Sequence, residues 1–315
     1  MKLRTKIVVL SLFALLLILL FLFIGLGSNW GYSLERRAWK IAAIVLTGVC
    51  IAFSTVIFQT VTNNRILTPN IIGLDSMYML IQTAVVYVFG STNKLLVDSN
   101  LNFMLTLALM MVFALLLYWV MFRREGNHLY FLLLVGIILG TLLGSMTTFL
   151  QLLIDPSEFL VLQGRMFASF NSVQGQLTVI CYIVAIAVGL YYMRLHKYMD
   201  AISLGKGHAV NLGVPYDAVV KQLLVIIAAL ISVATALVGP LTFLGLLVAN
   251  VAYQFMKTYR HAYLIPGAIL ISIIALVGGQ LIVERVFSFT TTVSVIINLV
   301  GGIYFLYLLL RENKS

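Results

Sequence analysis

The sequence predicts an all-α, polytopic membrane protein with about ten transmembrane helices. Of its 315 residues, 62% are hydrophobic and only 10% are charged, whereas a soluble domain has about 45–50% apolar and about 25% charged residues. So few charged side chains cannot cover that much apolar surface in water, which excludes a soluble globular protein. A helical crossing needs about 20 mostly apolar residues, or roughly 30 with its loop. Residues 1–315 are therefore expected to form a single transmembrane domain.

Ten apolar runs, separated by polar, glycine or proline breaks, give this count. The first run, residues 7–26, follows three basic residues and is longer than the about 7–15 apolar residues of a signal peptide. Two of the others are unusual, because one contains Asp75 and the run that begins at residue 240 is short. Such spans are tolerated only where they face protein or a water-filled path. The nine further runs are predicted near residues 41–60, 71–90, 101–122, 129–151, 175–193, 217–238, 240–256, 262–283 and 292–310.

The distribution of basic residues predicts the orientation. An even number of crossings places both termini on one side of the membrane. With the N-terminus in the cytoplasm, 14 of the 20 Lys and Arg residues fall in inside segments and 6 in outside segments, as the positive-inside rule requires. We therefore expect both termini to be cytoplasmic. The net charge of +10 is assigned to this rule and to contact with anionic membrane lipid, and not to binding of nucleic acid.

No catalytic motif is present in the sequence. It lacks the GxxxxGK[ST] phosphate loop, the HExxH helix and the GxSxG elbow. Cys50 and Cys181 lie within apolar runs, so they are interpreted as small buried residues and not as a disulfide or a metal pair. The four histidines stand close to Lys or Arg, which favours solvated loop positions over metal ligation. We expect no catalytic residue, no cofactor and no metal.

Acidic residues are scarce within the apolar runs. Asp75 is the only one placed inside a predicted span. Charged groups at bilayer depth usually mark proton or ion pathways, and an ion-coupled secondary carrier would be expected to contain more of them. Such a carrier is the alternative function, and a membrane-bound enzyme is a weaker one because no catalytic constellation is present.

Three basic residues on the outer side, Arg36, Arg37 and Lys40, lie where the positive-inside rule disfavours them. Two interpretations are open. Long basic side chains can anchor a helix at the membrane interface. Alternatively, the cluster can form a docking surface for an acidic partner.

The longest inside loop, residues 194–216, mixes small, apolar and basic residues. Its centre is expected to form two short helices joined at residues 205–207. They could form a plain amphipathic surface element or a knob that fits a groove on a cytoplasmic partner. Before the stop signal Gly213, four residues fall at helical spacing, namely Ala201, Leu204, His208 and Leu212.

Four motifs, in order and at matching spacing, resemble those of one family of membrane transport subunits. They are Arg37-Ala38-Trp39-Lys40 with Gly48, Ser54, Gln59, residues 64–69 and Ile71-Ile72-Gly73; Leu204-Gly205 with Ala209 and Leu212-Gly213; Val238-Gly239-Pro240-Leu241-Thr242-Phe243-Leu244-Gly245-Leu246; and the closing apolar helix, residues 301–311. The family is the FecCD type, the permease subunits of ABC importers for ferric siderophores, haem and cobalamin. The resemblance covers essentially the whole chain.

This resemblance implies the ten-helix, type II ABC importer permease fold in a bacterial cytoplasmic membrane. Two permease subunits would work with two cytoplasmic ATP-binding subunits and an extracytoplasmic substrate-binding protein or lipoprotein. Residues 163–170 resemble a branch of the family that handles siderophores. This favours a ferric siderophore as the cargo and a non-identical second permease, with cobalamin or haem as the alternative cargo.

The resemblance also implies roles for individual residues. Coupling to the ATPase is expected from segment 202–213, through Ser203, Leu204, Gly205, Lys206, His208, Ala209, Leu212 and Gly213. Docking of the binding protein is expected at Arg37, Lys40 and Arg285. The translocation path is expected to be lined by Gln59, Asn64, Pro69, Gly73 and Asn250.

Several residues depart from the family pattern. Lys40 replaces an Arg, which keeps the charge but loses bidentate pairing with a carboxylate. Trp39 replaces a Pro beside it, so the docking contacts are expected to differ in detail. Arg65 replaces a Pro, and Lys206 stands where an acidic residue is usual. These two changes suggest an ATPase partner adapted to this chain.

Overall fold

The computed structural model describes residues 2–24, 30–122, 129–171 and 173–312. These residues form helices joined by turns, and they contain no β-strand, so the predicted all-α class is confirmed. Three predicted features lie outside the described residues: the end of the first helix beyond residue 24, the basic break at 123–128, and Lys314.

A helix occupies each of the ten predicted apolar runs. These helices are α1 (Leu3–Phe23), α2 (Trp30–Thr62), α3 (Leu74–Phe89), α5 (Ser99–Phe122), α6 (Leu129–Leu153), α8 (Gly175–Tyr192), α11 (Tyr216–Val238), α12 (Leu244–Met256), α13 (His261–Arg285) and α14 (Val293–Glu312). Short elements connect them, namely the 3₁₀ helix η1 (Pro69–Ile72), α4 (Lys94–Val97), α7 (Pro156–Arg165), α9 (His196–Ile202) and α10 (Lys206–Asn211).

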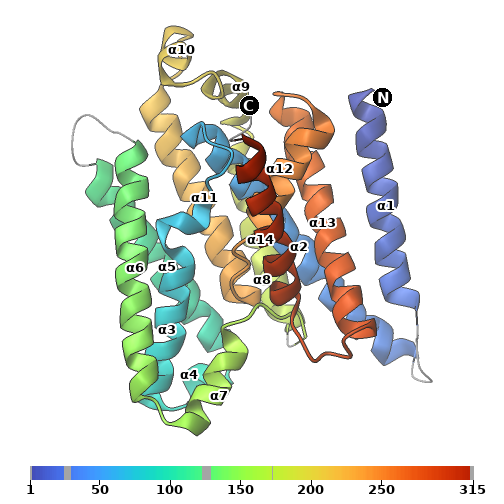
Figure 1. The fold of residues 1–315 in the computed structure, drawn as a ribbon, viewed down its shortest axis with the longest axis vertical. Helices are drawn as coiled ribbons and strands as arrows, with labels where there is room; N and C mark the ends of the chain where they lie inside the picture. Colours follow the sequence, from blue (N-terminus) through green and yellow to red (C-terminus); the bar gives the residue numbers. More distant parts are fainter. Residues whose placement is uncertain (1, 25–29, 123–128, 172, 313–315) are drawn as a thin grey trace.

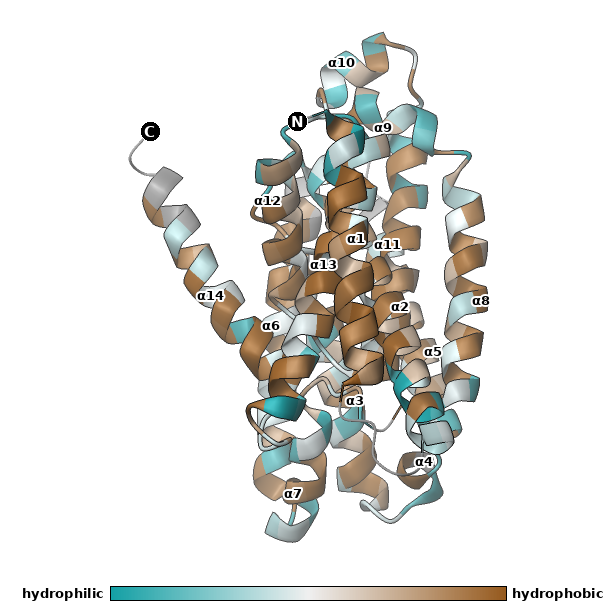
Figure 2. Ribbon diagram, turned by 90° about the vertical axis from the view of Figure 1, so that its right-hand side faces the viewer, coloured by the Kyte–Doolittle hydropathy of each residue, from teal (hydrophilic) through white to brown (hydrophobic). Residues whose placement is uncertain are grey.

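Within the described residues, seven helices are long and apolar enough to cross a bilayer, namely α1, α2, α5, α6, α8, α11 and α13. The helices α3, α12 and α14 are apolar but shorter. The chain is therefore a polytopic membrane protein. In Figure 2, the middle parts of the helices are hydrophobic, and polar residues gather toward the two ends of the bundle, as expected for helices that cross a membrane.

The two ends of the bundle carry different elements. At one end lie α9 and α10 together with the first and last described parts of the chain, the start of α1 and the end of α14, and at the opposite end lie α4 and α7 (Figure 1). We call these the α10 end and the α7 end. An even number of crossings predicts this arrangement, in which the termini and segment 202–213 share one side.

Helix α2 forms the centre of the bundle and packs against α11, α13, α12 and α8. It begins at Trp30 and not near residue 41, so Arg36, Arg37 and Lys40 lie on its first turns and not in a loop. A helix of 33 residues spans about 50 Å, whereas the hydrocarbon core is about 30 Å thick. The excess length carries the basic residues beyond the apolar part of the bundle.

Two spans start with irregular backbone. Residues 71–90 were expected to form one helix, but η1 precedes α3, and Gly73 between them adopts a left-handed conformation with φ +91°. Gly239, with φ +96°, ends α11 ahead of the turn that leads to α12. Positive φ values strain residues that have a Cβ atom, so glycine suits both positions.

The break between η1 and α3 is covered by helix α6. A Cβ atom added to Gly136 would lie 2.9 Å from the Cα atom of Ile72, and one added to Gly140 would lie 3.3 Å from the Cα atom of Gly73. The glycines of α6 therefore allow two backbones to meet, as small residues do in membrane helix packing. This contact holds η1 and the start of α3 in place.

The Gly136→Ala variant should be destabilised because its new methyl group meets the backbone of Ile72. Overpacking of this kind costs about 1–3 kcal/mol. The matched control is Gly144→Ala on the same helix, where an added Cβ atom has no neighbour within 4 Å. Thermal unfolding of the two variants in detergent measures the difference. Equal unfolding midpoints would show that the approach of α6 to η1 is not a tight contact.

Candidate functional site

Segment 202–213 forms a helical turn structure at the α10 end. Helix α9 ends with Ser203 as its C-cap, and Gly205, with φ +91°, is the N-cap of α10. Gly213, with φ +80°, follows α10. The two predicted short helices are confirmed, although the junction is at Gly205 and Gly207 lies inside α10.

This segment exposes large apolar side chains although it lies beyond the bundle. Leu204 is 57% exposed and Leu212 is 65% exposed, while Ala209 between them is fully buried. Lys206 lies beside them and pairs with Asp217 at 2.9 Å, with both side chains about half exposed. Exposed apolar side chains with a polar rim are typical of a protein contact surface.

The same segment is fixed to the bundle through α9. Met199 and Ile202 are buried, and the Oδ1 atom of Asp200 accepts hydrogen bonds from His261 at the start of α13. The backbone N–H of His261 donates at 3.0 Å and the ring Nδ1 lies at 2.6 Å. The ring Nε2 of His261 lies 2.8 Å from the hydroxyl of Thr60 on α2. One buried ring therefore joins α9, α13 and α2.

The charge of Asp200 is stabilised by this contact. Burial raises the pKa of the Asp200 carboxyl, but the hydrogen bonds and the charge of His261 outweigh burial, so that its pKa lies below its ordinary value. The carboxylate is thus ionised at neutral pH. The predicted solvated position for His261 is wrong, because its side chain is only 2% exposed. His196 and His208 are exposed as expected, and His128 lies outside the described residues.

The predicted path residues cluster around the turn between α2 and η1. The side-chain amides of Gln59 and Asn250 both donate to the carbonyl oxygen of Arg65, at 2.6 and 3.0 Å. The side-chain oxygen of Asn64 accepts from the backbone N–H of Ile66 at 2.9 Å. These bonds satisfy a non-helical backbone inside the bundle. Pro69, buried, and Gly73 shape the same turn, and the role of all five in the path stays a prediction.

A groove of about 490 Å³ with a mixed polar and apolar lining lies next to this turn. It combines residues of η1, α3 and α6 with the turn before α12. Asp75, Thr147, Thr148 and Gln151 are polar residues within predicted spans, but the sequence did not indicate that they face one groove. Its lining consists of Thr68, Asn70, Ile71, Asp75, Ser76, Met79, Gly144, Thr147, Thr148, Gln151, Met166, Pro240 and Thr242.

The three predicted docking residues lie together at the α7 end, and each makes contacts within the chain. Arg37 donates to the carbonyl oxygens of Phe21, Leu22 and Ile24, at 3.2, 3.0 and 2.7 Å. Arg285 also donates to the carbonyl oxygen of Ile24.

The last carbonyl groups of a helix have no partner within it, so the two arginines stabilise the end of α1. Lys40 forms an ion pair with Glu284 at 2.6 Å, and both side chains are 11% exposed. The proposed docking role of these residues stays a prediction.

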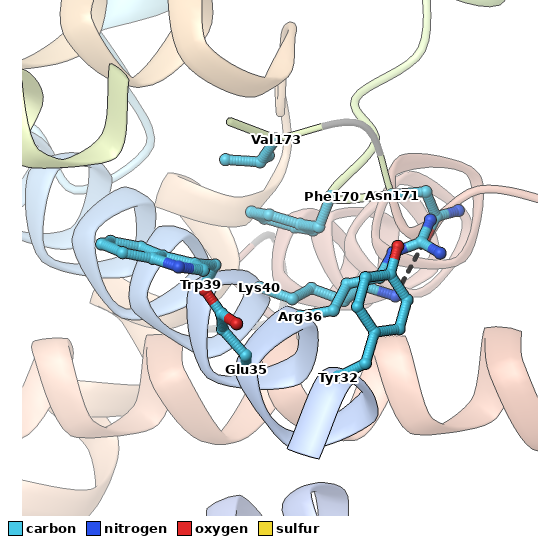
Figure 3. Close-up of a pocket in the computed structure, with 8 residues that line it drawn as sticks. All are labelled: Tyr32, Glu35, Arg36, Trp39, Lys40, Phe170, Asn171 and Val173. Carbon is cyan, nitrogen blue, oxygen red and sulfur yellow. Dashed lines mark hydrogen bonds between the residues drawn. The ribbon is translucent and has the colours of Figure 1, made fainter. Parts of the chain in front are cut away.

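A pocket of about 450 Å³ opens beside this cluster. Figure 3 shows that α2 and the segment after α7 form it together, with Tyr32, Trp39 and Phe170 as aromatic walls. Glu35 and Arg36 bring opposite charges to it, and Arg36 is exposed. The predicted docking set omitted Arg36, although Arg36 belongs to the basic cluster predicted on the outer side.

Comparisons with known proteins agree with the earlier resemblance. The model of the FecCD transport family matches residues 14–311. The petrobactin import system permease protein YclO of Bacillus subtilis is 58% identical over 315 residues, which is 100% of both chains. The corresponding protein FatC of Bacillus anthracis is 40% identical and covers 89% of this chain and 79% of its own.

A solved structure shares the fold. It is an inward-facing conformation of a transporter described as a metal-chelate type ABC transporter, with a TM-score of 0.85 and 18% sequence identity. The match covers 98% of this chain and 99% of the solved one. At this level of identity, the similarity concerns the fold alone.

The Asp200→Ala variant should loosen α9 and α10 because it removes both hydrogen bonds to His261. Two hydrogen bonds that each contribute about 1 kcal/mol correspond to a local opening equilibrium that is about thirtyfold more favourable. Amide hydrogen exchange across residues 196–211 measures this change. The control is Asp217→Ala, which removes the half-exposed pair with Lys206 and should leave exchange nearly unchanged. Similar exchange in both variants would refute the anchoring role of Asp200.

Proposed function

Because the chain belongs to the FecCD transport family, we propose that it is the permease subunit of a binding-protein-dependent ABC importer that carries a ferric siderophore. The observation that carries this proposal is the 58% identity, over the full length of both chains, to a permease named for petrobactin import. The motif order and the groove within the bundle support the same function. Cobalamin and haem, the cargoes of other branches, are less well supported.

The α10 end is the cytoplasmic end in this proposal, and the membrane is the bacterial cytoplasmic membrane. The excess of Lys and Arg in the inside segments supports this orientation. ATP-binding subunits, two per complex, would grip segment 202–213 and hydrolyse ATP outside this chain. The exposed Leu204 and Leu212 would enter a groove on the ATPase, with Gly205 and Gly213 setting the shape of the turn.

The movement of the ATPase subunits as they close would be transmitted to the membrane helices through α9. The buried contacts of Met199 and Ile202, together with the Asp200–His261–Thr60 connection, link α9 to α13 and α2. A push on α10 would therefore move the bundle and not only a loop. Such rigid transmission suits the alternation between inward and outward states that an importer requires.

A second permease subunit, non-identical to this one, would complete the channel. Helix α14 supports this part of the proposal because it leans away from the bundle (Figure 2) and exposes Leu299, Ile303 and Leu306. The groove beside η1 and α6 would belong to the cargo path. Resemblance of residues 163–170 to the siderophore branch supports a non-identical partner.

At the α7 end, an extracytoplasmic substrate-binding lipoprotein would dock on the basic cluster. Arg37, Lys40 and Arg285 contribute positive charge there while they also stabilise the chain, and exposed Arg36 is free of the contacts that hold those three. Complementary charge would orient the binding protein and speed its encounter.

Transport in proteoliposomes tests the proposed function. The chain is reconstituted with its ATPase, second permease and binding protein, and uptake of radioactive iron bound to a siderophore is followed. Uptake is expected to require ATP and to be insensitive to ionophores. Uptake without ATP that collapses with an ionophore would instead identify an ion-coupled carrier.

The Leu212→Asp variant should weaken the ATPase complex about tenfold or more, because it replaces an apolar contact worth about 1.5–3 kcal/mol with a charge. Binding of the purified ATPase to the detergent-solubilised permease measures the effect. The control is Gly207→Ala, where an added Cβ atom has no neighbour within 4 Å. Unchanged affinity of the Leu212→Asp variant would contradict the coupling assignment.

The Arg36→Glu variant should weaken docking of the binding protein several-fold, and more at low salt because exposed charges are screened by ions. The same charge reversal at Arg4, which is exposed at the α10 end, is the control. Titration of the binding protein at two ionic strengths separates the two variants. Equal affinities for both would exclude docking at the α7 end near Arg36.

A further inference from the structure

Asp75 lies where two short helices begin. It stands in the first turn of α3, and its Oδ2 atom accepts a hydrogen bond from the hydroxyl of Thr242, just ahead of α12, at 3.2 Å. The neighbouring Gly73 contacts Gly140, which lies near the middle of α6. Asp75 is therefore placed deep within the membrane part of the protein. Discontinuous helices that meet at this depth are a common construction of transport sites.

The carboxylate of Asp75 is poorly paired. Its Oδ1 atom is buried without a hydrogen-bond partner, and the ion pairs found among the described residues do not include Asp75. An unpaired carboxyl group at bilayer depth is expensive, and such residues usually serve function. Interhelical packing does not explain it, because the neutral hydroxyl of Thr242 is the only polar side chain that bonds to it among the residues that the structure describes.

The surroundings of Asp75 have room for a ligand. The groove of about 490 Å³ that Asp75 lines falls within the range of about 300–1,000 Å³ for small-molecule sites. Hydroxyl and amide groups make up the rest of its polar lining, which contains no Lys, Arg or His. Asp75 is thus the only ionisable group in that lining.

The local electrostatics decide which ligand group fits. The N-terminal end of α3 would by itself attract an anion, but Asp75 already supplies the negative charge at that end. A second anion would meet a carboxylate, whereas a donor with positive charge would satisfy its open acceptor positions.

We propose that Asp75 is a cargo-recognition residue that binds a protonated amine of the iron chelate as it passes through the groove. The inference rests on the proposed function and narrows its substrate class to amine-bearing ferric siderophores. Thr242 would act as a positioning residue, because its hydroxyl donates to Oδ2, the exposed oxygen of the carboxylate, and so orients that oxygen, which can still accept a second hydrogen bond, toward the groove.

Uptake by the complete reconstituted importer tests the proposal with a matched pair of probes. One probe is a ferric catecholate chelate that carries a primary amine, and the other is the same chelate with that amine acetylated. The wild-type importer should prefer the amine. The Asp75→Asn variant keeps the shape and can still accept from Thr242, yet the preference should fall about tenfold or more while uptake of the acetylated probe is retained.

Two controls separate recognition from a structural effect. The Ser76→Ala variant alters the same groove without changing charge and should keep the preference. Co-purification of the Asp75→Asn chain with the ATPase and the second permease shows that the complex assembles. Equal loss of both probes in Asp75→Asn, or an unchanged ratio, would overturn the role of Asp75. Equal uptake of both probes by the wild type would overturn it as well and leave the importer function intact, whereas no ATP-dependent uptake of either would overturn both proposals.

Discussion

The need to satisfy every backbone polar group without water governs this structure. In a bilayer, an unpaired N–H or C=O group costs several kcal/mol, so helices can break only where protein covers the break. The break between α2 and α3 follows this rule. Gln59 and Asn250 satisfy the carbonyl oxygen of Arg65, and the glycine face of α6 covers η1. At the end of α1, Arg37 and Arg285 fill the same role.

This constraint also explains why polar side chains in the bundle have two different uses. Gln59, Asn250 and Thr60 bond to the chain itself and keep irregular or terminal segments in place. Asp75 differs, because one of its oxygens is left without a partner beside a groove. A carboxylate whose one hydrogen-bond partner among the described residues is the hydroxyl of Thr242, at a depth where charge is expensive, is better explained by what passes through the groove.

The two ends of the bundle are built for different contacts. At the α10 end, a rigid connection through Asp200 and His261 supports an apolar surface that protrudes from the bundle. At the α7 end, positive charge gathers over the first turns of α2, partly neutralised by Glu284. An apolar contact suits the proposed ATPase partner, which must transmit force to the chain. A charged surface suits the proposed binding protein, which must associate and dissociate in each transport cycle. Both surfaces depend on α2, since it runs from one end to the other.

The sequence by itself determined the membrane class, the ten helices and the shared side of the termini. These features depend on the free energy of transferring each side chain from water to lipid, which is a property of the residue itself and does not depend on its tertiary contacts. The sequence also located the turn at Gly205, since that conformation is a local property. Tertiary structure alone decided that His261 is buried against Asp200, that Lys40 pairs with Glu284, and that Asp75 meets Thr242. Those contacts join residues far apart in the chain, and only the packing of the helices determines which of them come together.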